Sequence, residues 1–201
     1  MNTPTRTILI TGAGSGLGRG LSLYFGTHGH TIIATDVLLD SAKETVAQVE
    51  AAGGRAQAHA LDVTSESSIR VLGDTPVDVL VNNAGLQFVT GIDEYPAEKW
   101  DLLMDVMVKG PFLMTRAVLP GMRARNYGRI VHIGSIHSLV ASPFKSAYTA
   151  AKHALIGFSK VLALETGGAD VTSNTICPGY MRTPLVDKQI ADQARTRGIS
   201  E

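Results

Sequence analysis

The sequence has a single cysteine, no net charge and no long apolar run near its start. Because Cys177 is the one cysteine among 201 residues, an intrachain disulfide is excluded, and a reducing compartment is expected. The 18 basic residues balance the 18 acidic residues, and both signs are interspersed along the chain. This balance favours neither nucleic acid nor an anionic membrane as a partner.

The first apolar run, Thr7–Ile10, is too short for the core of a signal peptide or for a membrane span. We therefore expect a cytoplasmic protein without a membrane partner. With 44% hydrophobic residues the chain can bury the core of one globular domain. No repeat, linker or low-complexity tract divides it, so we expect residues 1–201 to form a single domain.

Short β-branched runs alternate with helical patterns, which predicts an α/β fold with a doubly wound parallel sheet between two helical layers. The expected strands are Thr7–Thr11, Thr31–Thr35, Arg55–Leu61, Val77–Val81, Arg129–Ile133 and Val171–Ile176. The expected helices include Ser41–Ala52, a short one within Ser65–Gly73, a region from about Ala97 to Ala124 interrupted at Gly110-Pro111, Lys145–Thr166, and a polar helix Thr183–Arg197.

A glycine-rich segment, Thr11–Gly18, separates the first expected strand from a helix. Glycines there let the backbone approach a pyrophosphate, and the N-terminus of the helix offers unpaired N–H groups to phosphates. A flexible turn is the alternative, but the strand–turn–helix context favours a nucleotide. The residues assigned to the cofactor by this pattern are Gly12, Ser15, Gly16, Leu17 and Gly18.

Asp36 ends the second expected strand, at the spacing of the acid that binds the adenosine ribose in dinucleotide sites. A 2′-phosphate at ~4 Å from this carboxylate would be repelled by ~4 kcal/mol at an effective dielectric of ~20. Neither Ser15 nor Val37 supplies a cation to offset that repulsion. A surface aspartate that caps the next helix is the alternative. We therefore expect NAD rather than NADP as the cofactor.

Two more segments follow expected strands, where ligands of open α/β sheets lie. They are Asp62-Val63 and Asn82–Gly85, and each alone would more often be a turn. An amide side chain there could serve the adenine edge. The cofactor residues expected from these segments are Asp62, Val63, Asn83, Ala84 and Gly85.

Tyr148 and Lys152 are four residues apart in an expected helix and therefore share one face. A phenol with a pKa near ~10 is a poor base, but a neighbouring ammonium and an oxidised nicotinamide would lower that pKa. Tyr148 could then act as general base in oxidation and general acid in reduction. Ser135, after the fifth strand, could hydrogen-bond the substrate oxygen. A Tyr-x-x-x-Lys pair alone is common by chance in amphipathic helices, but the motifs that precede it favour a catalytic role.

With these motifs in this order, the chain resembles the short-chain dehydrogenase/reductase family from Thr7 to about Thr183. The carriers are Thr11–Gly18, Asn82–Gly85, Ser135, Tyr148–Lys152 and Pro178-Gly179. The resemblance implies a Rossmann-type sheet with helices on both faces and Tyr148 as the acid/base. It also implies that Lys152 holds the nicotinamide ribose, and that Pro178, Gly179 and Thr183 meet the carboxamide.

Within that family the chain looks similar to the D-3-hydroxybutyrate dehydrogenases. The matching segments are Asn83–Gln87, His137, Ser142–Tyr148 and Ile176–Ile190. The resemblance implies that the substrate carboxylate is held by Gln87, His137, Lys145 and Gln189, and the reacting oxygen by Ser135 and Tyr148. Singly each of the four would be an ordinary polar residue, but together they favour a carboxylate, which accepts several hydrogen bonds and attracts a cation.

The chain departs from the family at Met107, which by alignment from Trp100-Asp101 replaces an asparagine whose backbone carbonyl holds a water of a proton relay. Pro111 lacks the N–H that a helix would direct to the Met107 carbonyl, so that carbonyl could still receive a water. We expect the replacement to affect the rate of turnover more than the type of reaction.

The family also continues past Glu201 into another helix and a seventh strand. Without that strand, Val171–Ile176 would be an unpaired edge, which predicts aggregation or a loss of stability. The segment between Asp62 and Val77 is shorter than usual as well. We expect a homo-oligomer with a dimer formed through the long helices, and whether it is a tetramer is left open.

Three functions stay open at this stage. The first is NAD-dependent interconversion of a small hydroxy acid and its keto acid, namely D-3-hydroxybutyrate and acetoacetate. The second is a short-chain dehydrogenase for another hydroxy acid, a polyol or a cyclic alcohol. The third is a truncated NAD-binding pseudoenzyme or interaction subunit, which Met107 and the short C-terminus support and the intact Ser135, Tyr148 and Lys152 oppose. The direction of reaction is open, and we expect no metal.

Overall fold

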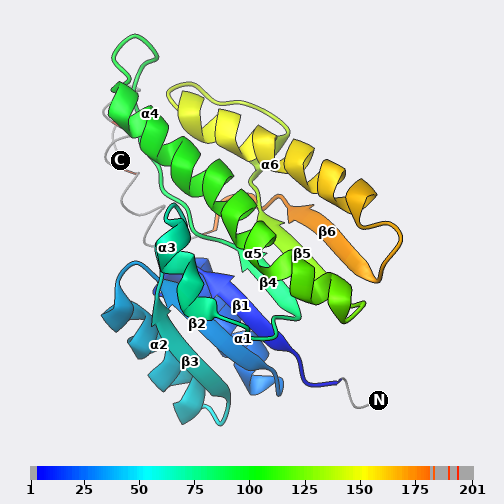
Figure 1. Cartoon of the computed structure of the whole chain (residues 1–201). Coiled ribbons are helices and arrows are strands. Elements are labelled where there is room, and N and C mark those ends of the chain that lie inside the picture. Colours follow the sequence, from blue (N-terminus) through cyan, green and yellow to red (C-terminus); the bar gives the residue numbers. More distant parts are fainter. Residues whose placement is uncertain (1–3, 182, 184–189, 191–193, 195–201) are drawn as a thin grey trace.

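The structure, a computed structural model, describes residues 4–181, 183, 190 and 194. Six parallel strands form one sheet in the order β3-β2-β1-β4-β5-β6 (Figure 1). The strands are β1 Thr7–Thr11, β2 Thr31–Asp36, β3 Arg55–Ala60, β4 Val79–Asn82, β5 Gly128–Ile133 and β6 Val171–Ile176. The α-helices are α1 Gly16–Thr27, α2 Leu39–Ala51, α3 Glu66–Ile69, α4 Ala97–Met104, α5 Gly110–Ala124 and α6 Ser146–Glu165.

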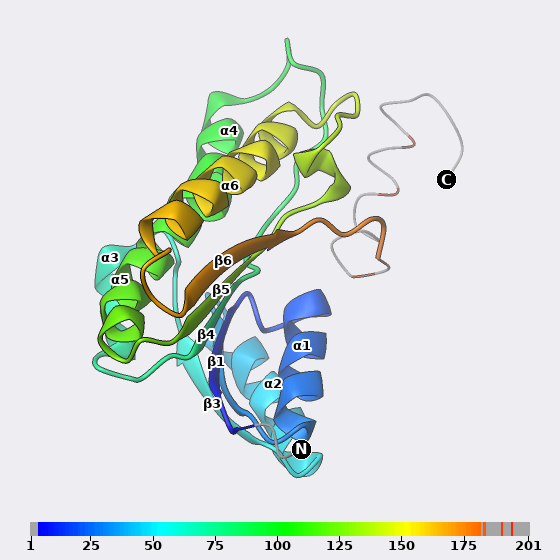
Figure 2. The same cartoon turned by 90° about the vertical axis from the view of Figure 1, so that its right-hand side faces the viewer.

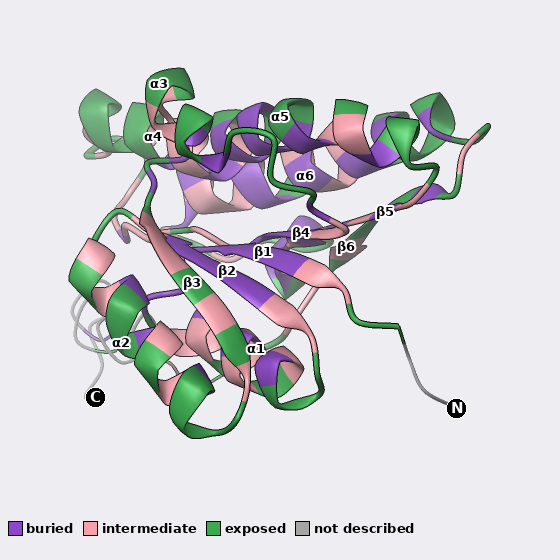
Figure 3. Ribbon diagram, turned by 60° about the horizontal axis from the view of Figure 1, so that its bottom comes forward, coloured by how far each residue is buried: buried purple, intermediate pink, exposed green. Residues whose placement is uncertain are grey.

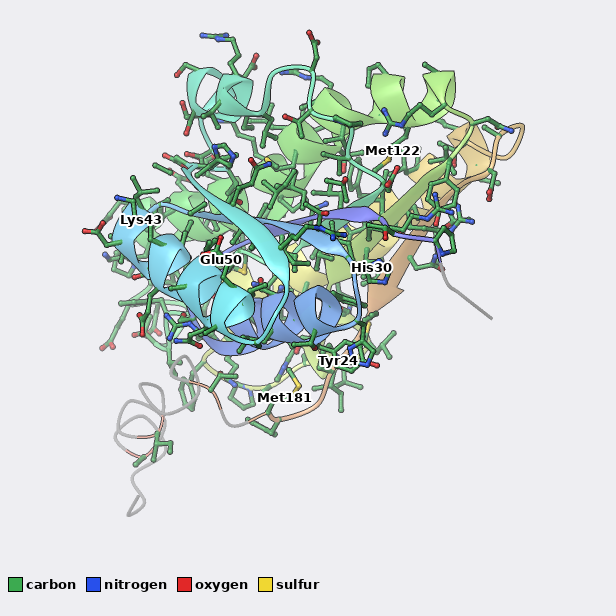
Figure 4. All side chains as sticks on the ribbon, turned by 90° about the horizontal axis from the view of Figure 1, so that it is seen from below. Tyr24, His30, Lys43, Glu50, Met122 and Met181 are labelled. Carbon is green, nitrogen blue, oxygen red and sulfur yellow. The ribbon has the colours of Figure 1, made fainter. Side chains whose placement is uncertain are left out.

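Helices cover both faces of the sheet, which confirms the predicted three-layer α/β/α fold of Rossmann type. In Figure 2, α1 and α2 lie on one face, and α3, α4, α5 and α6 lie on the other. Figure 4 shows Tyr24 of α1 and Met122 of α5 on opposite sides of the sheet. The described residues contain no helix that is both long enough and apolar enough to cross a membrane.

The alternation of side chains along the inner strands builds two apolar layers. Ile8 and Ile10 of β1 pack with Ile32 on the face covered by α1 and α2. Leu9 and Ile33 point the opposite way and join the core under α5 and α6. All five side chains are at most 2% exposed. Figure 3 shows this burial along β1 and β2, while β3 at the edge alternates between exposed and intermediate. Burial on both faces explains why the inner strands are continuously apolar.

The helical region expected from Ala97 to Ala124 changes its geometry where the sequence predicted an interruption. The segment Asp105–Lys109 forms one π-helical turn between α4 and α5, directly before Gly110. Pro111 explains the change, because it has no N–H to continue an α-helical ladder. The polar helix expected from Thr183 to Arg197 lies almost wholly outside the described residues.

The strand order reverses between β1 and β4, and this reversal positions the site. From β1 the chain adds β2 and then β3 on one side of the sheet. It then returns to the other side of β1, where β4 is added. The loops after β1 and β4 therefore diverge, which opens a crevice at the carboxyl ends of the strands. At the far side β6 pairs with β5 alone among the described strands.

Candidate active site

A cleft opens at the carboxyl ends of β1, β4, β5 and β6, and it gathers most of the residues predicted from the sequence. Those that line it are Gly12, Ser15, Gly16, Leu17, Asp36, Asn83, Ala84, Gly85, Ser135, Tyr148, Lys152, Pro178, Gly179 and Thr183. Ile133, Gly134 and Met181 line it too, although the sequence did not single them out. Motifs more than 160 residues apart in the chain thus meet in one cleft.

The glycine loop and the Asn82–Gly85 loop are tied together across the crevice. The hydroxyl of Thr11 accepts hydrogen bonds from the backbone N–H groups of Asn83 and Ala84, both at 3.0 Å. The amide of Asn83 donates in return to the carbonyls of Thr11 at 2.8 Å and Gly12 at 3.1 Å. Gly12 has φ +63°, and a Cβ there would lie 2.9 Å from the Cα of Ala84. Both N–H groups of the Asn83 amide are therefore engaged within the protein, not free for the adenine edge.

The first helix offers an open N-terminus to the cleft. Helix α1 begins at Gly16, and the side chain of its N-cap, Ser15, makes no capping hydrogen bond. The first N–H groups of the helix are thus available, which together with the positive end of the helix dipole suits a phosphate. A Cβ on Gly18 would come 2.3 Å from the Gly12 carbonyl oxygen, so Gly18 permits close packing of the helix on the loop.

Three predicted cofactor residues, Gly18, Asp62 and Val63, do not line this cleft. Asp62 is exposed, and its carboxylate accepts hydrogen bonds from the backbone N–H and the hydroxyl of Thr64, both at 2.8 Å. Val63 is 6% exposed and belongs to the core under α5. Their roles in binding a cofactor stay predictions.

Asp36 closes the cleft at the end of β2. Its carboxylate accepts hydrogen bonds from the backbone N–H groups of Gly14 and Leu38, both at 3.0 Å, which fix its position beside the glycine loop. The sequence analysis missed Arg19, a cation on α1 next to this loop. Arg19 donates to the Gly14 carbonyl and forms a 2.9 Å ion pair with Glu44, so its charge is already matched.

Tyr148 and Lys152 lie on one face of α6, as predicted. The Lys152 ammonium donates a 2.6 Å hydrogen bond to the carbonyl of Ile133 and lies 5.5 Å from the centroid of the Tyr148 ring. Burial lowers the pKa of Lys152 to about 8, against an opposing effect of Cys177. Burial raises the pKa of Tyr148, and a contact with the Ser135 hydroxyl only partly opposes that rise. The expected lowering of the Tyr148 pKa by Lys152 is therefore not found in the protein alone, because desolvation dominates.

Ser135 is held at the cleft by a tight turn after β5. Its hydroxyl accepts a 3.1 Å hydrogen bond from the backbone N–H of His137, and its own backbone N–H donates to the Ser138 hydroxyl at 3.1 Å. The N–H of Ile136 donates to the carbonyl of Pro178 at 2.8 Å, which joins the turn to the segment after β6. The two segments that border the reacting end of the cleft are thus mutually fixed.

Lys145, Gln87 and His137, predicted to hold the substrate carboxylate, are not among the residues that line the cleft, and the segments of Lys145 and Gln87 are joined to each other. The N–H of Thr90 donates to the carbonyl of Phe144 at 3.1 Å, which joins the segment after Gln87 to the loop that carries Lys145. Lys145 is only 3% exposed, yet among the described residues it forms no ion pair with a carboxylate. The Oε1 atom of Gln87 is buried and has no hydrogen-bond partner there. A buried cation without a carboxylate partner is costly, so Lys145 points to an anionic ligand, whereas the Gln87 Oε1 atom is an acceptor that needs a separate donor.

His137 lies between Ser135 and the loop of Lys145. Its Nδ1 atom is 3.3 Å from the Ser135 hydroxyl, its Nε2 atom is 2.8 Å from the Ser142 hydroxyl, and its ring meets the Tyr148 ring edge-on. Both ring nitrogens thus face hydroxyls of the protein, and the sequence analysis had given Ser142 no role beyond its place in a matching segment. Gln189, the fourth predicted carboxylate ligand, lies outside the described residues.

Met107 packs as a core residue beside the site. It is fully buried and shares a cluster with Leu103, Ala147 and Ala151, against which the Tyr148 side chain also packs. A Cβ on Gly85 would lie 3.5 Å from its sulfur. Within the described part of the chain, no three histidine, cysteine, aspartate or glutamate side chains are grouped so that they could hold a metal ion.

The sequence profile of the family described as short chain dehydrogenase matches residues 6–194. A D-beta-hydroxybutyrate dehydrogenase of Rhizobium meliloti is 44% identical over 98% of this chain and 80% of its own length. A protein of the same name from Cupriavidus necator is 41% identical over 96% of this chain and 78% of its own length.

A similar solved structure is that of a candidate NAD(P)-dependent gluconate 5-dehydrogenase from Beutenbergia cavernae with NADP bound at low occupancy. It superposes with a TM-score of 0.90 at 32% identity, over 98% of this chain and 81% of the other. A candidate 2-deoxy-D-gluconate 3-dehydrogenase from Agrobacterium tumefaciens with bound NADP superposes with a TM-score of 0.87 at 31% identity. The match covers 96% of this chain and 78% of the other. On the profile match, these identities and the shared fold, the chain belongs to the short-chain dehydrogenase/reductase family of oxidoreductases.

Proposed function

We propose that this oxidoreductase uses NAD to interconvert a small hydroxy acid and its keto acid, namely D-3-hydroxybutyrate and acetoacetate. The observation that carries the proposal is Lys145, a buried cation without a carboxylate partner among the described residues, three positions before Tyr148. The two relatives named D-beta-hydroxybutyrate dehydrogenase support it. In the proposed complex the substrate carboxylate pairs with Lys145.

Gln87 could add donors at the carboxylate end. Its amide offers two N–H donors that a carboxylate can accept, whereas its Oε1 atom, unpartnered in the described structure, is itself an acceptor and gives no support to a carboxylate. A carboxylate has room for several donors at once, so Lys145 and the Gln87 amide can bind it together. The contacts proposed for His137 and Gln189 rest on the resemblance alone.

The proposed chemistry at the other end of the substrate depends on Ser135, Tyr148 and Lys152. The bound dinucleotide supplies the hydride acceptor in oxidation and the hydride donor in reduction. The Tyr148 oxygen takes the hydroxyl proton in oxidation and returns it in reduction, while Ser135 hydrogen-bonds the reacting oxygen. Because burial raises the pKa of Tyr148 in the protein alone, a phenolate requires the additional positive charge of the oxidised cofactor.

The proposed preference for NAD over NADP rests on Asp36. Its carboxylate is fixed by Gly14 and Leu38, and it lines the cleft where the adenosine ribose would bind. Arg19, the nearest cation on α1, is already paired with Glu44. The two solved relatives contain NADP, so the choice between the cofactors is a specific point to test.

A second candidate is a larger hydroxy acid of the sugar-acid type. The two solved relatives are described as gluconate dehydrogenases, and such substrates also carry a carboxylate that Lys145 could pair with. A third proposal, a protein that binds the dinucleotide without turnover, is opposed by the intact Ser135, Tyr148 and Lys152. The cytoplasmic location, the single domain and the homo-oligomer stay predictions from the sequence.

The deciding experiment is a panel of substrates assayed with purified protein. D-3-hydroxybutyrate, L-3-hydroxybutyrate, gluconate, a polyol and a neutral secondary alcohol are each offered with NAD or with NADP, and reduced cofactor is measured. The proposal expects the highest kcat/KM for D-3-hydroxybutyrate with NAD. A higher value for gluconate would establish the second candidate, and binding of reduced cofactor without any turnover would establish the third.

A further inference from the structure

Ser135, His137 and Ser142 form a continuous series of hydrogen-bonding groups beside Tyr148. The Nδ1 atom of His137 faces the Ser135 hydroxyl at 3.3 Å, and its Nε2 atom faces the Ser142 hydroxyl at 2.8 Å. His137 and Ser135 are both buried, whereas Ser142 is partly exposed. The ring of His137 therefore connects the hydroxyl nearest the reacting oxygen with a second hydroxyl in the following loop.

The surroundings of His137 favour its neutral form. Burial lowers its pKa, and the nearby Lys145 and His153 lower it further. A neutral imidazole carries one N–H and one acceptor nitrogen, so the partner of one nitrogen decides the role of the other. The two tautomers consequently give the Ser135 hydroxyl two different roles.

Ser142 selects between the tautomers. His137 is the one hydrogen-bond partner that the described structure gives to the Ser142 hydroxyl, so the Ser142 proton has no other protein acceptor there. If Ser142 donates to Nε2, the ring proton resides on Nδ1 and is directed at the Ser135 oxygen. That oxygen then accepts from Nδ1 and from the backbone N–H of His137, and its own proton is free for another acceptor.

In the opposite tautomer Ser135 would donate its proton to Nδ1, and that proton would no longer be available for a hydrogen bond to the substrate. We propose that Ser142 is a positioning residue that, through His137, keeps the Ser135 hydroxyl directed as a donor at the reacting oxygen. The inference deepens the proposed function and rests on it. It assigns His137 a role in orienting Ser135, and because both ring nitrogens are then engaged, no N–H of the ring is left for the carboxylate contact implied by resemblance.

The test combines kinetics with the tautomer of His137. Ser142→Ala should lower kcat roughly three- to tenfold, the loss expected for one neutral hydrogen bond, with little change in KM for the substrate or in binding of reduced cofactor. Ser142→Thr keeps the hydroxyl and should restore kcat. Ser67→Ala is a matched control, because Ser67 lies on α3 and does not line the cleft, and it should leave kcat unchanged.

Nitrogen-15 spectra of histidine-labelled protein report the tautomer, with the His137 signals assigned by their loss in His137→Asn. The unmodified protein should show the proton on Nδ1, and Ser142→Ala should shift it wholly or partly to Nε2. A proton on Nε2 in the unmodified protein, or an unchanged tautomer and kcat in Ser142→Ala, would overturn the inference. Absence of turnover in the unmodified protein would instead refute the proposed function, whereas the tautomer would still decide the hydrogen-bond arrangement.

Discussion

The Nζ atom of Lys152 donates a 2.6 Å hydrogen bond to the carbonyl oxygen of Ile133, the last residue of β5. This bond fixes a buried cation beside the Tyr148 ring, although burial lowers the pKa of Lys152 to about 8 and raises that of Tyr148. Lys152 and Tyr148 are therefore already in position, but the protein alone does not favour the ionised form of the Tyr148 phenol. A positive cofactor at the same place would favour the Tyr148 phenolate, so proton transfer is coupled to cofactor binding.

Tyr148→Phe should abolish turnover and leave the binding of reduced cofactor largely intact. The phenylalanine keeps the ring that packs against the Met107 cluster and loses only the oxygen that transfers the proton. Steady-state turnover and fluorescence titration with reduced cofactor measure the two properties separately. Substantial residual turnover would mean that another group is the acid/base.

Asp36→Asn should narrow the preference for NAD over NADP. The substitution removes the charge, while the amide oxygen can still accept the hydrogen bond from Gly14. The repulsion between charges about 4 Å apart at an effective dielectric of about 20 is ~4 kcal/mol, and the loss of roughly a third of it lowers the ratio of the two kcat/KM values about tenfold, which is the change we expect. Glu44→Gln frees Arg19 but keeps the Asp36 charge, and it should shift the ratio less. Equal use of both cofactors by the unmodified protein contradicts the role of Asp36.

Lys145→Met should harm substrates that carry a carboxylate and spare neutral ones. A lost charge-assisted contact is worth ~1.5–3 kcal/mol, which is roughly a ten- to hundredfold drop in kcat/KM. Because a buried cation without a carboxylate partner is costly and, among the described residues, the Lys145 ammonium has only the Tyr180 ring 5.6 Å away, the same substitution should not lower the free energy of unfolding. Kinetics with D-3-hydroxybutyrate and a neutral secondary alcohol, together with urea denaturation, check both points. Equal losses for both substrates would show that Lys145 supports the fold around Tyr148 instead.

His132 should make the protein sensitive to acid. It is fully buried, with its ring nitrogens 3.2 Å from the Asn82 amide and 3.4 Å from the Ser173 hydroxyl, and burial followed by the charge of Lys152 lowers its pKa to about 4. An unfolded histidine has a pKa near 6.5, so the stabilisation is complete above that value and is lost as the pH falls toward 4.

The loss attributable to His132 should be about 2 kcal/mol between about pH 7 and about pH 5. His132→Asn should therefore flatten the dependence of the unfolding free energy on pH by that amount, as measured by urea denaturation at both values. His59→Asn on the edge strand β3 is the control, since no side-chain hydrogen bond of His59 is found in the described structure. An unchanged pH dependence in His132→Asn would contradict the prediction.

The fold could be predicted from local patterns because its strands are short, apolar and separated by turns. The bounds predicted for β1 and β6 agree with those in the structure, and the predicted ends of the other strands differ from the observed ends by at most two residues. Periodicity alone could not show that Gly110-Pro111 would be accommodated by a π-helical turn over Asp105–Lys109. That outcome also depends on tertiary packing, because α4 and the π-helical turn lie against α6.

The cofactor side of the site was also predictable, because its motifs lie at strand ends that a parallel sheet brings together. Side-chain hydrogen bonds and burial were not. The pairing of Arg19 with Glu44 spans 25 residues, and the contact of Ser142 with His137 depends on the path of a loop. The raised pKa of Tyr148 likewise follows from desolvation, which spacing in the sequence does not report.

Formation of reduced cofactor by the purified protein with NAD and D-3-hydroxybutyrate tests the proposed function most directly. We predict turnover with the D enantiomer, at least about tenfold slower turnover with the L enantiomer, and none with Tyr148→Phe. A carboxylate held at Lys145 and an oxygen held at Ser135 and Tyr148 leave one hydrogen facing the nicotinamide, which explains the difference between enantiomers. Equal rates for both enantiomers, or a rate with the D enantiomer no higher than that of Tyr148→Phe, would contradict it.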